Sequence, residues 1–150
     1  MSPSDCVFCQ IVNRQLPAEV LYENDRVIAI LDVNPIHYGH ALIIPKMHAP
    51  DFLHVRETDL YDVLRATQIV ARAIVKALHL EGFNIFSNNG KVAGQSVFHF
   101  HLHVTPRYAD DNITFVLQLK KYTQAAMADY GARIRSCVEE TTSFDTRRTH

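Results

Sequence analysis

Three histidines, His99, His101 and His103, occupy alternate positions in the stretch Gly94–Val104, and bulky apolar residues stand between them. Successive side chains of a strand point to opposite faces, so this spacing predicts a strand with all three imidazoles on one side and the apolar residues on the other. Folding alone does not require three imidazoles in a row, because each must be solvated or hydrogen-bonded. The pattern therefore indicates a polar pocket floor, suited to phosphate chemistry or to a metal.

Two cysteines near the N-terminus form a candidate ligand pair. Two residues separate Cys6 from Cys9, and zinc binds four nitrogen or sulfur ligands in a tetrahedron. His48 and one of the alternating histidines are candidates to complete the set, and His99 is the best of these because it lies at the edge of the run. A closed Cys2His2 set has no open position, so this zinc would be structural. Without a metal, the pair would be buried thiols or a redox pair.

His101, at the centre of the histidine face, is the candidate nucleophile. A hydrogen bond donated by one ring nitrogen would fix the tautomer and leave the other nitrogen free to attack phosphorus, which would give a covalent phosphoramidate. His103 and His40 would neutralise charge on the phosphate, and Ser96 would pass a proton to the leaving group. Backbone N–H groups of the Gly94–Ser96 loop would bind phosphate oxygens.

The length of 150 residues predicts a single domain with a substantial core. A net charge of -1 argues against a general nucleic-acid binder, which would show a basic excess. The N-terminus lacks the pattern of a signal peptide, and no apolar stretch approaches the roughly 18 residues of a membrane span. Three cysteines do not make a disulfide framework, and Cys137 is most simply a small apolar helix residue. These features predict a cytoplasmic protein.

Hydrophobic periodicity and turn residues predict the elements that position the candidate residues. They are a short helix or turn at 6–13, a hairpin of 19–23 and 26–31, strands at 40–44 and 82–87, and helices at 58–79 and within 117–139. The apolar face of the 58–79 helix is wide, which indicates a dimer. The domain would span residues 1–140, and residues 141–150 would form a flexible tail.

These motifs resemble the signature of the histidine-triad (HIT) family, in which three histidines alternate with apolar residues. The resemblance covers about residues 5–108. Besides Gly94–Val104, it rests on Cys6–Val12, Leu16-Pro17-Ala18, Asp32 with Pro35, and Gly39–Lys46.

The resemblance implies an α+β fold with a five-stranded antiparallel sheet and a long helix. Two protomers would join their sheets into one continuous ten-stranded sheet. It also implies a structural zinc ion on Cys6, Cys9, His48 and His99, and catalysis by His101 with His40, His103 and Ser96. The implied nucleotide pocket places Phe8 and Ile11 near the base, Asp32 on the ribose hydroxyls, and Asn88, Gly94, Gln95 and Val97 around the phosphates.

The function expected from this resemblance is a nucleotidyl hydrolase or transferase. It would cleave the α-phosphate bond of a purine nucleoside 5′-monophosphate derivative of the phosphoramidate type, from AMP or GMP, through a nucleotidyl-histidine. Three alternatives stay open. The substrate could be a dinucleoside polyphosphate, the protein could be a nucleotide-binding, zinc-stabilised signalling or scaffold dimer, or the three histidines could hold a catalytic metal.

Overall fold

The structure is a computed structural model that describes residues 5–145, and side chains at 139, 140 and 142–145 are not described. The chain divides into two compact units, residues 1–113 and 114–150. The first contains every candidate site residue. In the described part of the chain, no helix is long and apolar enough to cross a membrane.

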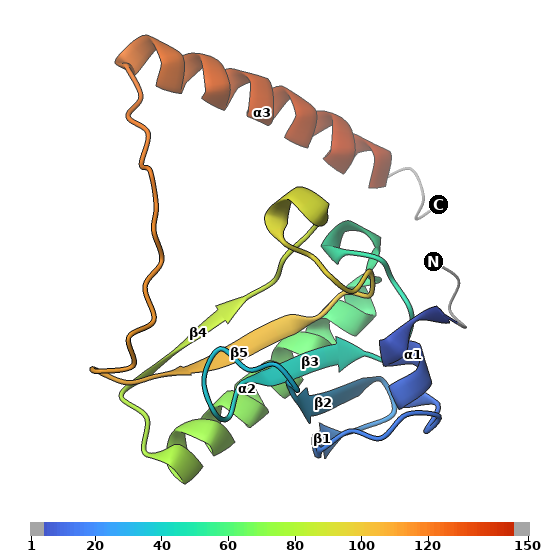
Figure 1. Cartoon of the computed structure of the whole chain (residues 1–150). Coiled ribbons are helices and arrows are strands. Elements are labelled where there is room, and N and C mark those ends of the chain that lie inside the picture. The colour runs from blue at the N-terminus through green and yellow to red at the C-terminus, as the bar shows by residue number, and fades with distance from the viewer. Residues whose placement is uncertain (1–4, 146–150) are drawn as a thin grey trace. The chain divides into compact units, whose positions relative to one another are not determined.

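The first unit is built on one five-stranded sheet with the order β1-β2-β3-β5-β4, and all neighbouring strands are antiparallel (Figure 1). The strands are β1 (Val20–Glu23), β2 (Val27–Leu31), β3 (Ala41–Pro45), β4 (Gly82–Phe86) and β5 (Leu102–Arg107). The α+β fold class and the five-stranded antiparallel sheet are therefore confirmed. The ten-stranded dimer stays a prediction.

The hairpin of β1 and β2 turns at Asn24, whose side-chain oxygen accepts hydrogen bonds from the N–H groups of Arg26 (2.9 Å) and Val27 (2.8 Å). Asn commonly stabilises turns in this way. The central strands β2 and β3 are nearly continuous apolar runs because both of their faces are covered.

Helix α2 (Glu57–Leu78) packs on one face of the sheet and encloses the larger core between them. Its buried residues recur at three- and four-residue intervals, as the 58–79 helix prediction requires. The helix ends at Leu78, and the next residue, His79, adopts the left-handed conformation with φ 52° and provides the C-cap. The short helix α1 (Val7–Val12) contributes to a second core on the other face of the sheet, with Ile28, Ile30 and Leu42.

The histidine stretch departs from the predicted strand in its first half. β5 begins only at Leu102, so His99 and His101 lie in a segment outside the sheet ladder. Continuing the register of β3 and β5 would place Phe100 opposite Pro45, which has no N–H to donate. The N–H of Phe100 instead donates to the carbonyl of Ala49 at 2.7 Å. The strand prediction for residues 97–101 is therefore wrong, although their side chains still alternate between the two faces.

In the second unit, helix α3 (Gln124–Asp145) begins inside the predicted range 117–139 and continues beyond 139. Residues 141–145 of the predicted tail are thus helical in the structure, and 146–150 lie outside the described residues. The segment 114–123 before the helix forms no helix or strand.

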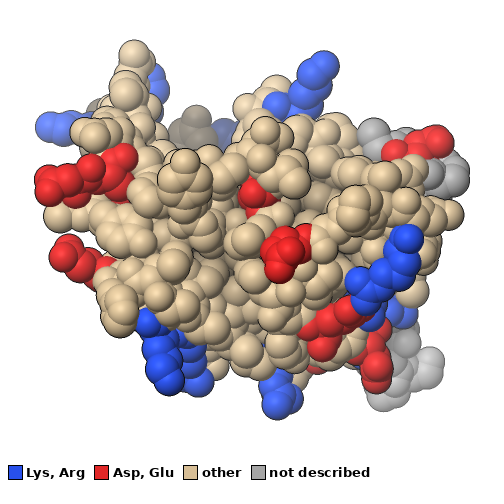
Figure 2. Space-filling model, turned by 60° about the horizontal axis from the view of Figure 1, so that its bottom comes forward, with Lys and Arg blue, Asp and Glu red and all other residues tan. Residues whose placement is uncertain are grey.

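Figure 2 shows one face of the chain, on which Lys and Arg side chains are scattered rather than gathered. This face therefore offers no continuous basic surface of the kind that binds nucleic acid.

Candidate active site and candidate metal centre

The side chains of the histidine stretch separate onto two faces of the sheet. Phe100 and Val104 belong to the core beneath α2. His99 and His101 lie on the opposite face, where both rings make edge contacts with Phe8 of α1 at centroid distances of 5.9 and 5.0 Å. Alternation therefore places the imidazoles together, as the sequence pattern predicts.

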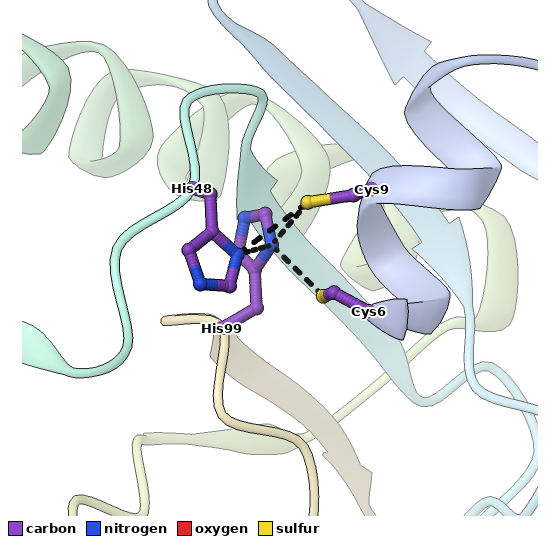
Figure 3. Close-up of side chains that lie close together, drawn as sticks. All are labelled: Cys6, Cys9, His48 and His99. Carbon is purple, nitrogen blue, oxygen red and sulfur yellow. Dashed lines mark hydrogen bonds between the residues drawn. The ribbon is translucent and has the colours of Figure 1, made fainter. Parts of the chain in front are cut away.

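His99 faces a cluster of two thiols and a second histidine. Its Nδ1 lies 3.4 Å from Cys6 Sγ, 3.6 Å from Cys9 Sγ and 3.3 Å from His48 Nδ1 (Figure 3). His48 Nδ1 lies 3.4 Å from Cys9 Sγ, and all four candidate ligand atoms lie within 4.8 Å of one another. The cysteines come from the start of α1, whereas His48 follows β3, so the cluster joins three distant segments.

The dimensions and chemistry of this cluster fit a tetrahedral zinc ion. Zinc–nitrogen and zinc–sulfur bond lengths require ligand separations of about 3.3 Å between nitrogens and about 3.6 Å between nitrogen and sulfur. His99 Nε2 donates to the carbonyl of Pro45 at 2.7 Å, which leaves the Nδ1 lone pair directed at the thiols. Burial, together with the neighbouring Cys6, raises the pKa of the Cys9 thiol to about 11. The Cys9 thiol would therefore be protonated without a cation.

A cavity of about 450 Å³ lies beside this cluster and is predominantly apolar. Four elements contribute to it: α1, the end of β2 with the following loop, β3, and the histidine stretch. Its lining is Val7, Phe8, Ile11, Leu16, Pro17, Ala18, Ile30, Leu31, Asp32, Val33, Asn34, Leu42, Ser96, Val97, His101 and His103. The volume is in the range of small-molecule sites, and the few polar lining residues are Asp32, Asn34, Ser96, His101 and His103.

His101 presents one defined nitrogen to this cavity. Its Nδ1 donates a hydrogen bond to the carbonyl of His99 at 2.7 Å, so Nε2 carries the free lone pair. The side chain is 6% exposed, and burial lowers the pKa of His101, which keeps the ring neutral and nucleophilic near pH 7.

His103 and His40 form a pair at the same end of the cavity. His40 Nε2 lies 2.9 Å from His103 Nδ1, and the His103 ring stacks on Phe86 with centroids 4.5 Å apart and planes 7° from parallel. Burial is the main cause that lowers the pKa of His103 to about 4, and it also lowers the pKa of His40. Both rings are therefore neutral near pH 7.

Asp32 lines the cavity at the end of β2. Its Oδ1 accepts a hydrogen bond from the N–H of Asn34 at 2.9 Å, which is an Asx-type turn interaction. Its Oδ2 lies 3.6 Å from His40 Nδ1. The carboxylate thus has both a local structural partner and a position at the cavity wall.

The structure brings most of the predicted nucleotide residues to the cavity. Phe8, Ile11, Asp32, Ser96, Val97, His101 and His103 line it, and His40 lies behind His103. Asn88, Gly94 and Gln95 are not part of the lining.

The side chain of Gln95 is used within its own loop. Its Oε1 accepts from the N–H of Gly90 at 2.8 Å, and its Nε2 donates to the carbonyls of Pro50 (2.7 Å) and Val97 (3.1 Å). Gly94 adopts φ 86°, a conformation that favours glycine. These contacts shape the loop that carries Ser96, and they hold the Gln95 amide within the loop.

Several residues of the site were missed by the sequence reasoning. Leu16, Pro17 and Ala18 line the cavity, and their place in a recognisable motif was an available signal. Phe86 and the Pro45 carbonyl gave no signal, because a strand aromatic and a backbone acceptor look the same in sequence wherever they occur. Their roles depend on the partners that the fold brings to them.

The fold and the site define a class of protein with a histidine-lined cavity beside a Cys2His2 cluster on a five-stranded sheet. The HIT domain model matches residues 13–110, and the chain belongs to the HIT family.

Two curated relatives carry names that state an activity. The chain is 36% identical over 135 residues to an adenylylsulfatase, HINT3, from Arabidopsis thaliana, covering 90% of this chain and 68% of the relative. It is 37% identical over 102 residues to an adenosine 5′-monophosphoramidase, HNT1, from Saccharomyces cerevisiae, covering 68% of this chain and 62% of the relative.

Solved structures share the fold. A protein from Streptococcus mutans matches with a TM-score of 0.86 at 34% identity, covering 91% of this chain and 87% of that chain. A Zn-bound histidine triad family protein from Mycobacterium smegmatis matches with a TM-score of 0.72 at 36% identity, covering 88% of this chain and 99% of that chain.

Proposed function

We propose that this protein is a nucleotidyl hydrolase of the phosphoramidase type, which forms a covalent nucleotidyl-histidine on His101. The hydrogen bond from His101 Nδ1 to the carbonyl of His99 carries this proposal, because it leaves Nε2 as an unprotonated nitrogen in a nucleotide-sized cavity. The printed activities of the two relatives, an adenylylsulfatase and an adenosine 5′-monophosphoramidase, support an AMP-type substrate.

Substrate binding follows from the distribution of lining residues. Phe8 and Ile11 offer apolar surface to a purine base, and the Asp32 carboxylate would accept hydrogen bonds from the ribose hydroxyls. The α-phosphate would then lie at the histidine end. Backbone N–H groups of Ser96 and Val97 would approach its oxygens, because those of Gly94 and Gln95 already donate to the carbonyls of Lys91 (3.0 Å) and Gly90 (3.2 Å).

The reaction proceeds in two displacements. In the first, His101 Nε2 attacks the α-phosphorus, the bond to the leaving nitrogen breaks, and Ser96 Oγ–H protonates that nitrogen. In the second, water attacks phosphorus, the imidazole leaves with its electron pair, and the Ser96 oxygen recovers a proton from the water. The carbonyl of His99 stabilises the positive charge on the phosphorylated imidazole through the Nδ1–H bond.

The charge of the cavity favours a substrate with few negative charges. None of its lining residues, all within the described chain, is Lys or Arg, and Asp32 adds a negative charge. Neutral donors suffice for one phosphate, whereas the several charges of a dinucleoside polyphosphate would call for cations. We therefore favour a nucleoside phosphoramidate over a dinucleoside polyphosphate.

We propose that zinc occupies the Cys6, Cys9, His48 and His99 cluster. As a closed tetrahedral ion it would supply cross-linking of the N-terminal segment to the chain around β3 and the histidine stretch, and no Lewis-acid position for a substrate. Among the described residues, the three alternating histidines do not converge on one point, because His99 faces the thiols while His103 faces His40. This geometry disfavours the three-histidine catalytic metal.

We also propose a homodimer through α2 and the edge strand β4. Leu64, Phe83 and Ile85 are exposed there, and they line an apolar groove of about 610 Å³ with Ala71 and Val75 of α2. An exposed edge strand next to an apolar helix face invites pairing with the same strand of a second copy. Sedimentation equilibrium of the wild type against Ile85→Lys would test this, and a wild-type monomer at micromolar concentration would contradict it.

The proposed function is tested by trapping the intermediate. Wild-type protein mixed with an adenosine 5′-phosphoramidate and quenched within one turnover should contain a peptide spanning residues 95–107 with the mass of an added AMP on His101. Parallel assays with a diadenosine polyphosphate should show much slower turnover. Tight nucleotide binding without any adduct or turnover would instead support the signalling or scaffold alternative.

A further inference from the structure

A short chain of hydrogen bonds begins at the loop between β2 and β3. The backbone N–H of Ile36 lies 3.1 Å from His40 Nδ1. A peptide N–H can only donate, so His40 Nδ1 must present a lone pair. The side chain of His40 is 2% exposed, and solvent therefore does not compete for this nitrogen.

The hydrogen bond between His40 and His103 makes the tautomer of His103 depend on that of His40. A neutral imidazole carries its proton on one nitrogen only, so His40 must carry it on Nε2 and donate to His103 Nδ1 at 2.9 Å. His103 must then carry its own proton on Nε2. This atom is buried and has no hydrogen-bond partner within the part of the chain that the structure describes, while the residue lines the cavity.

The loop that holds Ile36 is itself closed by backbone bonds. Asp32 N–H donates to the carbonyl of His40 at 2.9 Å, and His40 N–H donates to the carbonyl of His37 at 3.0 Å. The Ile36 side chain is 44% exposed, and the loop is held by these backbone bonds rather than by packing of that side chain. Asp32 Oδ2, 3.6 Å from His40 Nδ1, is the one nearby acceptor among the described residues that would favour the opposite tautomer.

We propose that the backbone N–H of Ile36 is a positioning group that sets the direction of the His40–His103 hydrogen bond and so makes His103 Nε2 a donor to the bound phosphoryl group. The inference rests on the proposed function. The site then presents two different groups to the substrate. The lone pair on His101 Nε2 faces the electrophilic phosphorus, and the N–H on His103 Nε2 faces a phosphoryl oxygen beside it. If His40 were reversed, His103 Nε2 would present a lone pair to a phosphoryl oxygen and repel it.

The test removes the Ile36 N–H donor and keeps the isoleucine side chain. Replacing the peptide bond before residue 36 by an ester, with the hydroxy-acid analogue of isoleucine, deletes the donor, and Ile36→Ala is the matched control that keeps it. Nitrogen-15 NMR of the histidine side chains distinguishes protonated from unprotonated ring nitrogens. The wild type and Ile36→Ala should show His40 and His103 protonated on Nε2, and the ester variant should show mixed tautomers for both.

Activity gives a second readout. The ester variant should lose about five- to tenfold in kcat on an adenosine 5′-phosphoramidate, with a much smaller change in KM, because one hydrogen bond is lost. Ile36→Pro, which follows Pro35, removes the same N–H by ordinary mutagenesis and should show the same tautomer mixture if the ester variant fails to fold.

A wild-type spectrum with His40 or His103 protonated on Nδ1, or an ester variant with unchanged tautomers, would overturn the proposal. Either result leaves the proposed hydrolase intact. Conversely, full turnover by His101→Ala would refute the hydrolase mechanism and leave the tautomer assignment standing.

Discussion

Two neighbouring histidines of one segment use opposite ring nitrogens. His99 donates from Nε2 to the carbonyl of Pro45 and turns Nδ1 toward the thiol cluster, whereas His101 donates from Nδ1 to the carbonyl of His99 and turns Nε2 toward the cavity. Each ring has one nitrogen held by a backbone acceptor and one lone pair available. The roles that we propose for the two histidines, zinc ligand for His99 and nucleophile for His101, therefore depend on which ring nitrogen a carbonyl occupies.

The largest expected effect is the loss of kcat when the proposed nucleophile, His101, is removed. His101→Ala removes the attacking nitrogen, and we expect kcat on an adenosine 5′-phosphoramidate to fall by about 10⁴-fold or more, as for other covalent nucleophiles. Steady-state rates and the mass of the trapped adduct measure this. His101→Ala should still bind zinc, which serves as the control, and turnover close to wild type would remove His101 from its role.

Zinc binding at the proposed metal site should depend on His99. In His99→Ala, we expect zinc content to fall from one per chain to nearly none, with a loss of affinity of at least about 10²-fold, since even an outer-shell partner contributes that much. His103→Ala, which changes a histidine outside the thiol cluster, should keep its zinc. Metal analysis after dialysis against a chelator compares the two, and equal zinc loss in both variants would contradict the separation of the sites.

A fall in pH should lower the stability of the folded protein through protonation of His103. Its folded-state pKa of about 4 lies below the ordinary value of 6.5, so the unfolded chain binds more protons between these limits. Stability is therefore complete above about pH 6.5 and decreases as the pH falls toward about 4, by about 1–2 kcal/mol for this residue after allowance for partial exposure. Urea unfolding of the wild type and His103→Asn at pH 7, 6 and 5 measures it. An identical pH slope for both proteins would exclude this contribution.

The smallest expected effects are those of substituting Phe86 and Phe8, which contact the histidine rings. Phe86 stacks on His103, whereas Phe8 contacts both His99 and His101. An aromatic pair contributes about 0.5–1.5 kcal/mol, so Phe86→Leu should lower kcat severalfold and leave zinc affinity unchanged. Phe8→Leu should lower both kcat and zinc affinity. A variant of Phe86 with weakened zinc binding would show that the two ends are not independent.

Much of the fold follows from local sequence pattern. The β1–β2 hairpin, β3 and α2 occur close to their predicted bounds because Asn24, the apolar strand runs and the helical periodicity act locally. The extent of the histidine strand was not predictable, since it depends on where Pro45 stands in the partner strand. The end of α3 at Asp145 also lies beyond the predicted range, since apolar periodicity indicates a helix without fixing its last residue.

The sequence by itself determined which residues share a face. Alternation along Gly94–Val104 places the imidazoles opposite Phe100 and Val104 because side-chain direction has a period of two in extended backbone. It also supplied Cys6 and Cys9 as a ligand pair.

Only the tertiary structure decided which nitrogen of each ring is free. The carbonyls of Pro45 and His99 and the N–H of Ile36 belong to backbone that any sequence possesses. Their effect depends on being within about 3 Å of a particular nitrogen, where a hydrogen bond fixes the tautomer. That proximity arises from the packing of distant segments, which is why the chemistry of each histidine was settled by the fold.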